Sequence, residues 1–385
     1  MTDGAPRNHK PSLMLFIPAF TGGGAERVAS NLLSFLEKHF DIVLVLVENR
    51  RTYPVPGNVR VEALSGSLGG LTAHILRIPL HILSLVRLVR RYRADVVLSI
   101  LEQANIINIF ASRIIPYKVV ISQHIEPRRQ YGSKGVLGKI IFSASRILYR
   151  KAHHVISVSR GIKDVLLRDY CLRPDAVTVI YNPIDGRFFS TYSADPPLFE
   201  LPERFLLHVG RLRLAAKAQD VLLEAFRKVS KRHPGLALVL VGEGEDRRKI
   251  EDMVKEYDLE RSVIFAGWQE NVAALMNRAE IVVLPSRYEG FPMVLVEALA
   301  MGCPVVGADC PTGPREILGD DEYGLLVPVE DPDSLAAAVE RLLEDESLRA
   351  HYSRRALERA DDFDLEKIGN QYKRVLNRVM AKQAE

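Results

Sequence analysis

The chain has 385 residues, of which 47% are hydrophobic and 26% are charged. This length exceeds what one hydrophobic core usually supports, so a single small module is excluded and two domains of roughly 150 to 200 residues are expected. The composition excludes a disordered, collagen-like or disulfide-built protein.

The net charge of +4 hides an asymmetry between the two parts of the chain. Residues 1–200 contain 26 Lys and Arg against 15 Asp and Glu, whereas the remainder contains 26 against 33. No acidic residue occurs between Glu62 and Asp95, or between Glu126 and Asp164. We therefore expect the first part of the chain to meet an anionic partner.

Short apolar runs alternate with amphipathic segments along the chain, which is typical of βα units on parallel sheets. The first series of predicted strands is 13–18, 42–47, 96–100, 119–122, 155–158 and 177–181. The second series is 205–209, 236–241, 263–266, 281–284, 304–308 and 324–327. An irregular stretch, 185–202, separates them. The pattern predicts an α/β protein with two tandem Rossmann-like domains, 1–186 and 187–364, that face a central cleft.

The sequence predicts a cytoplasmic protein without a membrane span. The apolar run 75–89 is interrupted by Arg77 and Arg87, so it is shorter than the roughly 20 residues that a span needs. No secretory signal is recognised at the N-terminus. The three cysteines form no CxxC pair and are expected to be buried thiols of a reducing compartment: Cys171, Cys303 and Cys310.

The glycine run 22–24 follows the first predicted strand and opens a predicted helix. Glycines let backbone amides approach a ligand closely. As a dinucleotide-binding motif the run is weak, because the GxGxxG spacing is not met.

Two basic residues, Arg211 and Lys217, follow the predicted strand 205–209. An arginine can bind a diphosphate through two hydrogen bonds, and a lysine adds a mobile point charge. The alternative is an ordinary solvated loop, since Arg213 also lies there.

The segment 285–300, PSRYEGFPMVLVEALA, follows a predicted buried strand with a polar loop and a helix. Free amides of Met293 and Val294 at the helix start would stabilise phosphate oxygens. Glu289 and Glu297 could accept hydrogen bonds from sugar hydroxyls. For either glutamate alone, a helix-favouring residue in an ordinary connection is the alternative interpretation.

Together these segments resemble family 4 of the retaining, nucleotide-sugar-dependent glycosyltransferases, which have the GT-B fold of two Rossmann-like domains. The likeness covers nearly the whole chain and depends on the order and spacing of its motifs. They are GGAER at 23–27, SQH at 122–124, YNPID at 181–185, GRL at 210–212 with Lys217, VGEG at 241–244, the pair Glu289 and Glu297, and CPTGPRE at 310–316.

The resemblance implies roles for the donor site. Arg211 and Lys217 would hold the diphosphate of a nucleotide sugar, Glu297 its ribose, and Glu289 the hydroxyls of the donor sugar. Further donor contacts would come from the backbone amides of Gly290, Phe291, Met293 and Val294.

The resemblance also implies roles for other parts of the chain. His124 would act near the anomeric carbon of the donor, while Gly23 and Gly24 would close over the phosphate and the acceptor. The final segment, 365–385, would form a helix that crosses back to the first domain. One departure is Ala218, where the family usually has glycine.

The implied reaction retains the anomeric configuration through front-face attack. The leaving diphosphate helps to deprotonate the acceptor hydroxyl, and Arg211, Lys217 and helix dipoles stabilise its charge. We expect neither a cofactor nor a metal. The triplet 331–333, DPD, looks like the DxD motif of metal-dependent glycosyltransferases, but it opens a predicted helix, so capping is the better interpretation.

The basic, aliphatic segment 68–93 has two interpretations. It is either a core helix with an exposed arginine edge or an interfacial helix with arginines on anionic headgroups. The apolar residues expected to face acyl chains are Ile75, Leu76, Leu80, Leu83 and Val86. The segment 128–151 adds further basic charge.

The interfacial interpretation predicts a peripheral enzyme on the inner face of the cytoplasmic membrane. It would move a hexose or N-acetylhexosamine from a nucleotide sugar to a polyprenyl-diphosphate-linked saccharide in surface polysaccharide or glycan assembly. UDP is the commonest nucleotide in the family.

Other functions remain as alternatives. They are a glycosyltransferase with a soluble acceptor, and a sugar-nucleotide epimerase or a phosphorylase of the same fold. A nucleic-acid partner is not expected, because the acid-free stretches have few aromatic residues on which bases could stack.

Overall fold

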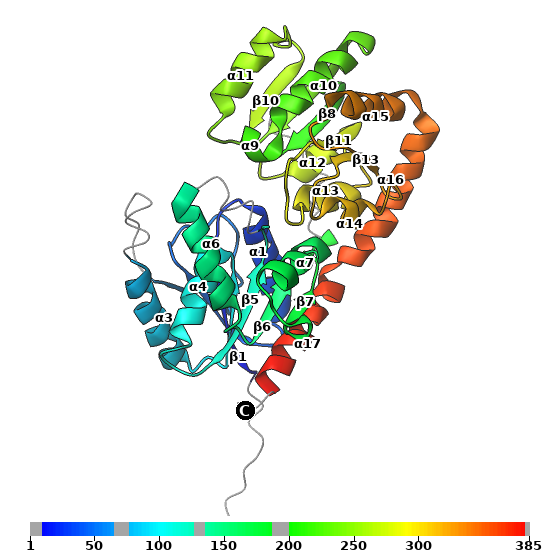
Figure 1. Ribbon diagram of the computed structural model, residues 1–385. Coiled ribbons are helices and arrows are strands. Elements are labelled where there is room, and N and C mark those ends of the chain that lie inside the picture. The colour runs from blue at the N-terminus through cyan, green and yellow to red at the C-terminus, as the bar shows by residue number, and fades with distance from the viewer. Residues whose placement is uncertain (1–9, 65–76, 127–134, 187–199, 382–385) are drawn as a thin grey trace, which may run out of the picture. The chain divides into compact units, whose positions relative to one another are not determined.

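The computed structural model describes four stretches of the chain: 10–64, 77–126, 135–186 and 200–381. They divide into two compact units, each built on its own parallel sheet (Figure 1). The first unit comprises Met1–Val158, Ile162–Pro183 and Leu365–Glu385, and the second comprises Ser159–Gly161 and Ile184–Asp364. The predicted α/β fold with two tandem Rossmann-like domains is confirmed.

The sheet of the first unit has seven parallel strands in the order β3-β2-β1-β4-β5-β6-β7. They are β1 (Ser12–Ile17), β2 (Asp41–Leu46), β3 (Arg60–Ala63), β4 (Val96–Ile100), β5 (Lys118–Gln123), β6 (His154–Ser157) and β7 (Val177–Val179). The inner strands are apolar runs covered on both faces, as parallel strands require. The sequence does not predict β3, because its residues RVEA form no apolar run.

Helices cover both faces of this sheet. They are α1 (Gly24–Leu36), α3 (Ile78–Tyr92), α4 (Glu102–Ala111), α6 (Gly135–Tyr149), α7 (Arg160–Asp169) and α17 (Leu365–Ala381), with a 3₁₀ turn at Pro174–Ala176. Helix α3 packs against α4, and α4 against α6, so these three lie on one face. Helices α1 and α17 pack together on the other face (Figure 1).

Helix α3 has one buried and one exposed face. Its buried side chains are His81, Leu85, Val86 and Val89. Leu80 and Leu83 are 60% and 45% exposed. The prediction that Val86 faces outward is wrong, because Val86 lies on the stripe that packs toward α4. Ile75, Leu76 and residues 128–134 lie outside the described residues.

None of the helices within the described stretches is long and apolar enough to cross a membrane. The cysteine prediction is correct at two positions and wrong at one. Cys303 and Cys310 are buried, whereas Cys171 is exposed. Cys171 lies two residues after the end of α7, where the chain leaves the helix in a left-handed backbone conformation (φ 50°).

The last helix, α17, packs on α1 within the first unit. Its apolar residues recur at helical spacing and form one buried stripe: Leu365, Ile368, Tyr372, Val375, Leu376 and Val379. At Gly369 the two helices approach so closely that a Cβ atom would lie 2.5 Å from the ring of Phe35. The absence of a side chain at Gly369 therefore sets the spacing of the pair.

The sheet of the second unit has six parallel strands in the order β10-β9-β8-β11-β12-β13. They are β8 (Arg204–Val209), β9 (Leu236–Val241), β10 (Val263–Gly267), β11 (Ile281–Leu284), β12 (Val305–Ala308) and β13 (Leu325–Val327). The helices are α9 (Leu214–Lys217), α10 (Gln219–Arg232), α11 (Arg247–Glu256), α12 (Val272–Met276), α13 (Met293–Ala300), α14 (Pro314–Leu318), α15 (Pro332–Glu344) and α16 (Glu346–Ala360), with a 3₁₀ turn at Asp361–Phe363.

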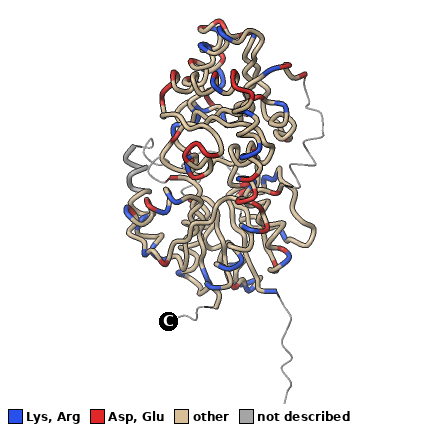
Figure 2. Tube along the Cα trace, turned by 90° about the vertical axis from the view of Figure 1, so that its right-hand side faces the viewer, with Lys and Arg blue, Asp and Glu red and all other residues tan. Residues whose placement is uncertain are grey.

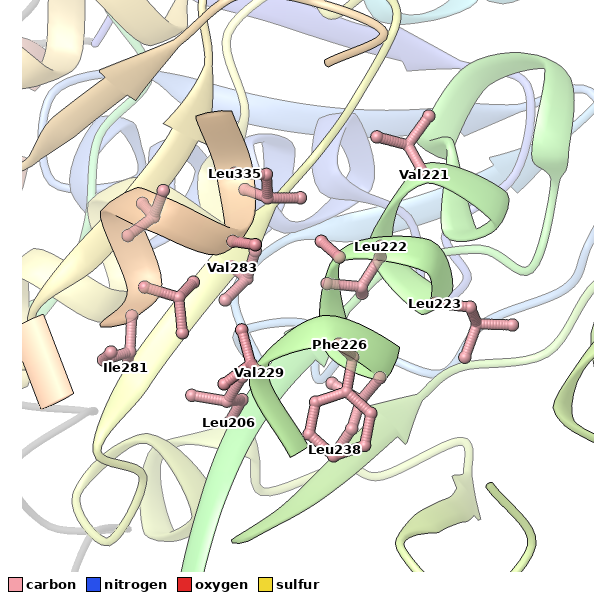
Figure 3. Close-up of a cluster of buried hydrophobic side chains, with 14 of the residues drawn as sticks. Leu206, Val221, Leu222, Leu223, Phe226, Val229, Leu238, Ile281, Val283 and Leu335 are labelled. Atoms are coloured by element: carbon pink, nitrogen blue, oxygen red, sulfur yellow. The ribbon is translucent and has the colours of Figure 1, made fainter. Parts of the chain in front are cut away.

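The core of this unit lies where α10 and α15 pack on the sheet (Figure 3). Phe226 of α10 and Leu335 of α15 are buried there with Leu206 of β8 and Val283 of β11. Strands β8 and β11 are neighbours, yet they are separated in the chain by β9 and β10. The strand order reverses between them, and ligands of such sheets bind at the carboxyl ends of the strands at this point.

The contact at Gly369 predicts the sign of a stability change. Helix propensity alone would make Gly369→Ala stabilising by about 1 kcal/mol. Because the new methyl group overlaps the buried ring of Phe35, we expect a net loss of about 1–3 kcal/mol in the free energy of unfolding of the first unit. Urea denaturation measures it. Gly57→Ala, whose Cβ would meet no atom within 4 Å, is the control, and a stabilised Gly369→Ala variant would contradict the packing.

Candidate active site

The loop after β11 and the start of α13 form a polar edge on the second sheet. Helix α13 begins at Met293, with Pro292 as its extended N-cap residue (φ −70°, ψ 109°). The amides of Met293 and Val294 lie in the first turn, where no helical carbonyl is available to them. Gly290 and Phe291 precede them in the loop and are buried.

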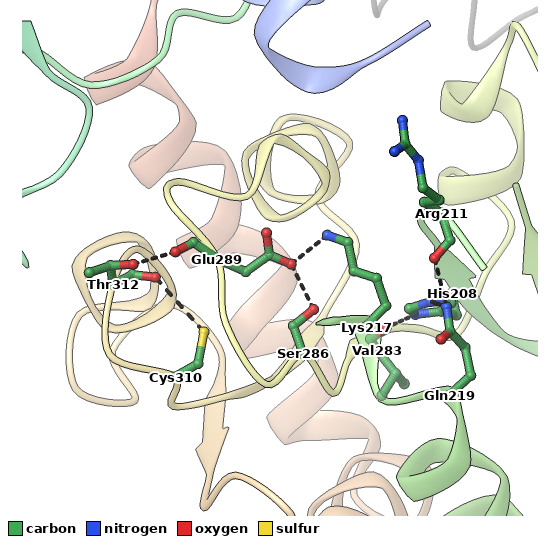
Figure 4. A network of polar contacts seen from close by, with 9 residues as sticks. All are labelled: His208, Arg211, Lys217, Gln219, Val283, Ser286, Glu289, Cys310 and Thr312. Carbon is green, nitrogen blue, oxygen red and sulfur yellow. Dashed lines mark hydrogen bonds and ion pairs between the residues drawn. The ribbon is translucent and has the colours of Figure 1, made fainter. Parts of the chain in front are cut away.

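An ion pair joins this loop to the loop after β8. The Lys217 ammonium lies 2.5 Å from Oε1 of Glu289, and the two side chains are only 21% and 11% exposed. Ser286 donates from its hydroxyl to the same oxygen at 2.6 Å (Figure 4). Thr312 donates to the backbone carbonyl of Glu289. Two residues 72 positions apart are thus brought into one site.

Arg211 lies in the same loop as Lys217, but its side chain is exposed and points away from the ion pair (Figure 4). The backbone carbonyl of Arg211 accepts a hydrogen bond from Nε2 of Gln219 at 3.0 Å. Gln219 also contacts the ring of His208, whose Nδ1 lies 3.0 Å from the carbonyl of Val283. The base of the loop is fixed, while the guanidinium is available to a ligand.

Close backbone contact holds the Arg211 loop against the loop after β9. A Cβ atom at Gly242, which has φ 131°, would lie 2.1 Å from the carbonyl oxygen of Gly210. A Cβ atom at Gly244 would lie 2.2 Å from the carbonyl oxygen of Leu212. The VGEG segment therefore needs glycine at both positions so that the two loops can pack.

The backbone conformation at Ala218 shows why the family usually has glycine at this position. It is fully buried between α9 and α10 and adopts the left-handed conformation (φ 51°, ψ 43°). This conformation costs a residue with a Cβ atom roughly 1–2 kcal/mol, whereas glycine adopts it freely. The family glycine is thus the residue that suits this backbone, and alanine occupies it under strain.

Glu297 lies in α13 and is 5% exposed. Asp331 accepts a hydrogen bond from the amide of Ser334 at 2.9 Å, at the start of α15. The interpretation of the DPD triplet as a helix cap is confirmed.

His124, Gly23 and Gly24 belong to the first unit. His124 follows β5, is 7% exposed, and lies with Nε2 3.0 Å from the hydroxyl of Ser122. Burial lowers the pKa of His124 to about 3, so its ring is neutral at physiological pH. Gly23 is the N-cap residue of α1, and a Cβ atom there would lie 2.2 Å from Oε2 of Glu26, so the carboxylate packs directly on the glycine.

Three contributors to the site were not predicted. Ser286 and Thr312 hold Glu289, and Arg287 anchors the turn that carries Lys217. Ser286 and Arg287 lie within the PSRYEGFP loop, so their proximity to Glu289 in the sequence could have indicated a role. Thr312 is 23 positions from Glu289, and only the folded structure brings the two together.

The site combines the groups that a sugar diphosphate needs. Lys217 and Arg211 provide positive charge, and the first turn of α13 provides free amides for phosphate oxygens. The carboxylates of Glu289 and Glu297 can accept hydrogen bonds from hydroxyls. All of these residues belong to the second unit.

Comparison with known proteins agrees with this chemistry. A family model described as Glycosyltransferase Family 4 matches residues 22–187, and one described as Glycosyl transferases group 1 matches residues 194–359. A relative from Campylobacter jejuni subsp. jejuni is 31% identical over 362 residues, which span 92% of this chain and 96% of that protein. It is named N-acetylgalactosamine-N,N'-diacetylbacillosaminyl-diphospho-undecaprenol 4-alpha-N-acetylgalactosaminyltransferase.

Two solved structures share the fold. Sucrose-phosphate synthase from Thermosynechococcus elongatus superposes with a TM-score of 0.82 at 20% identity, covering 96% of this chain and 99% of that one. Anabaena HepE, solved in complex with UDP and glucose, has a TM-score of 0.79 at 20% identity, covering 95% and 100%. At this identity the likeness shows the GT-B fold alone.

The buried histidines predict a pH dependence of stability. Burial lowers the pKa of His124 to about 3 and that of His208 to about 4, against 6.5 in the unfolded chain. Between these values the unfolded chain binds protons that the folded protein does not, so the free energy of unfolding decreases as the pH falls below about 6.5. For His124→Asn we expect a flatter decrease between pH 6 and 4, by up to about 1.4 kcal/mol per pH unit.

Urea denaturation at a series of pH values measures this difference. His351→Asn, at an exposed position of α16, is the control and should keep the wild-type dependence. Identical pH dependence in the wild type and His124→Asn would show that His124 protonates equally in both states.

Proposed function

The chain belongs to glycosyltransferase family 4, and we propose that it moves a hexose or N-acetylhexosamine from a UDP-sugar to a hydroxyl of a lipid-linked saccharide. The observation that carries the proposal is the Lys217–Glu289 pair beside the exposed Arg211, at the point where the strand order reverses. The Campylobacter relative is named for transfer to a diphospho-undecaprenol-linked saccharide, and HepE was solved with UDP and glucose.

Each donor group has a proposed partner. Lys217 and Arg211 bind the diphosphate, and the amides of the first turn of α13 bind its oxygens. Glu289 binds hydroxyls of the sugar, and Glu297 binds the ribose. Lys217 exchanges its contact with Glu289 for a phosphate oxygen when the donor binds, which frees the carboxylate for the sugar.

The proposed mechanism retains the anomeric configuration by front-face attack. As the glycosidic bond to the diphosphate breaks, Lys217, Arg211 and the α13 amides stabilise the developing charge without a metal. A phosphate oxygen of the leaving group accepts the proton of the attacking hydroxyl. His124, neutral because it is buried, contributes hydrogen bonding near the sugar and no charge.

A surface of the first unit supports a membrane-bound acceptor. Of the seven large hydrophobic side chains that are exposed in the described residues, five lie on or beside α3, α4 and α6: Leu80, Leu83, Phe110, Ile114 and Ile147. Helices α3 and α6 contain no acidic residue, and Arg87 and Arg90 of α3 are exposed. We refer to these five apolar residues together with Arg87 and Arg90 as the basic apolar surface.

The second unit differs in its charge pattern. Along its helices Lys and Arg are mixed with Asp and Glu (Figure 2), and many pair, as Arg232 does with Glu340 at 2.7 Å. The basic apolar surface instead combines exposed arginines with apolar groups, the composition that binds anionic bilayers. Each basic residue near such a bilayer contributes about 1 kcal/mol, so peripheral attachment on the cytoplasmic face needs no lipid anchor.

Replacing the donor groups tests the donor site. We expect Lys217→Ala, Arg211→Ala, Glu289→Ala and Glu297→Ala each to lower turnover on the order of 10²- to 10³-fold, because each removes a preorganised partner of the donor. Turnover is measured with the best donor from a panel of UDP, GDP and ADP sugars.

Arg213→Ala is the matched control for Arg211→Ala. Arg213 lies in the same loop, but its guanidinium pairs with Glu245 at 3.1 Å. Wild-type turnover in the Arg211 and Lys217 variants would refute the assignment of the diphosphate site.

Sedimentation with liposomes tests the membrane proposal. Because burying each leucine contributes about 1.5–3 kcal/mol, the double variant Leu80→Ser/Leu83→Ser should bind anionic liposomes at least about tenfold more weakly than the wild type. Both side chains are exposed, so folding should be unaffected. Leu357→Ser, at a 53% exposed position of the second unit, is the control. Failure of the wild type to bind, with full activity on a soluble acceptor, would refute this part of the proposal.

A further inference from the structure

Arg287 lies in the loop between β11 and α13, two residues before Glu289, and its side chain is 20% exposed. Its Nη1 and Nη2 atoms donate to the carboxylate of Asp220 at 2.9 and 2.7 Å. Nε and Nη2 donate to Glu330, the latter at 2.9 Å, and Nη1 also donates to the carbonyl of Leu214 at 2.5 Å. All five N–H groups of the guanidinium are therefore used within the protein.

These contacts hold the turn that carries Lys217. The backbone amide of Arg287 donates to the carbonyl of Ala216 at 2.9 Å, so Arg287 binds α9 at two carbonyls. Asp220, which accepts hydrogen bonds from the Arg287 guanidinium, lies in α10. Arg287 thus contacts the chain on both sides of Ala218.

Ala218 is the position that needs such support. It is held in the left-handed conformation, which is unfavourable for a residue with a Cβ atom. If the turn relaxed at Ala218, α9 would shift and Lys217 would move away from Glu289. The fork of Arg287 opposes this movement, because it fixes α9 and α10 to the loop that carries Glu289.

We propose that Arg287 is a positioning residue for the donor: by clamping α9 and α10 across Ala218, it keeps Lys217 opposite Glu289, where the diphosphate binds. The proposal rests on the proposed function of the site. Arg287 touches no substrate, since its donors are already occupied. Lysine could not replace it, because an ammonium has three donors and lacks the planar fork.

The test is Arg287→Lys, which keeps the charge. We expect the KM for the donor to rise at least about tenfold, with a smaller change in kcat and an unchanged KM for the acceptor, because a displaced Lys217 weakens donor binding. Arg204→Lys is the matched control. Arg204 makes a two-bond fork to Glu280, at 2.6 and 3.1 Å, at the opposite end of β8. Its kinetics should remain those of the wild type.

Hydrogen exchange separates this proposal from the proposed function, because it needs no turnover. In Arg287→Lys the amides of residues 213–219 should exchange at least about tenfold faster, while those of the sheet stay protected. Unchanged exchange in this segment, or faster exchange throughout the second unit, would overturn the proposal that Arg287 positions Lys217, even if the enzyme were active. A wild type that accepts no nucleotide sugar would refute the proposed function and leave the exchange result to decide on the clamp.

A second substitution tests the link to strain. Ala218→Gly introduces the residue that adopts the left-handed conformation freely, so it should reverse part of the rise in donor KM that Arg287→Lys causes. The measurement is the donor KM of the double variant. Failure to reverse any of the rise would overturn the claim that Arg287 acts across Ala218.

Discussion

The ion pair between Lys217 and Glu289 is the interaction on which the proposed donor site depends. It exists because β8 and β11 are adjacent and parallel, so the loops that follow them leave the sheet at the same edge. Both charges lie where water has limited access, and each holds the other in place. A phosphate can replace the carboxylate beside Lys217 and keep the ammonium paired, while Glu289 retains the hydroxyl of Ser286 as a donor and can accept further hydrogen bonds from sugar hydroxyls.

The surrounding structure holds the two halves of this pair. Ser286 and Thr312 fix Glu289, while the packing of Gly242 on Gly210 and the fork of Arg287 fix the loop that carries the cations. Most of these contacts use backbone atoms or rigid groups. These groups are already ordered in the folded protein, so in the proposed mechanism donor binding needs only a change of partner at Lys217.

The strands that are buried on both faces could be predicted from the sequence. Inner strands such as β9 and β11 are unbroken apolar runs, whereas β3 lies at an edge and its RVEA sequence carries no such signal. The positions of Lys217 and Glu289 in their loops were predicted, but their direct contact was not, since it depends on strand order. The strain at Ala218 and the fork of Arg287 depend on backbone dihedral angles and on residues distant in sequence. Local patterns do not encode these.

The central claim is that Lys217 leaves Glu289 for the diphosphate of the donor. Calorimetric titration of the preferred nucleoside diphosphate and its monophosphate tests it in the wild type and in Lys217→Met. We predict that the wild type binds the diphosphate at least about tenfold more tightly than the monophosphate, and that this ratio falls toward one in Lys217→Met. The same ratio in both proteins would contradict the account.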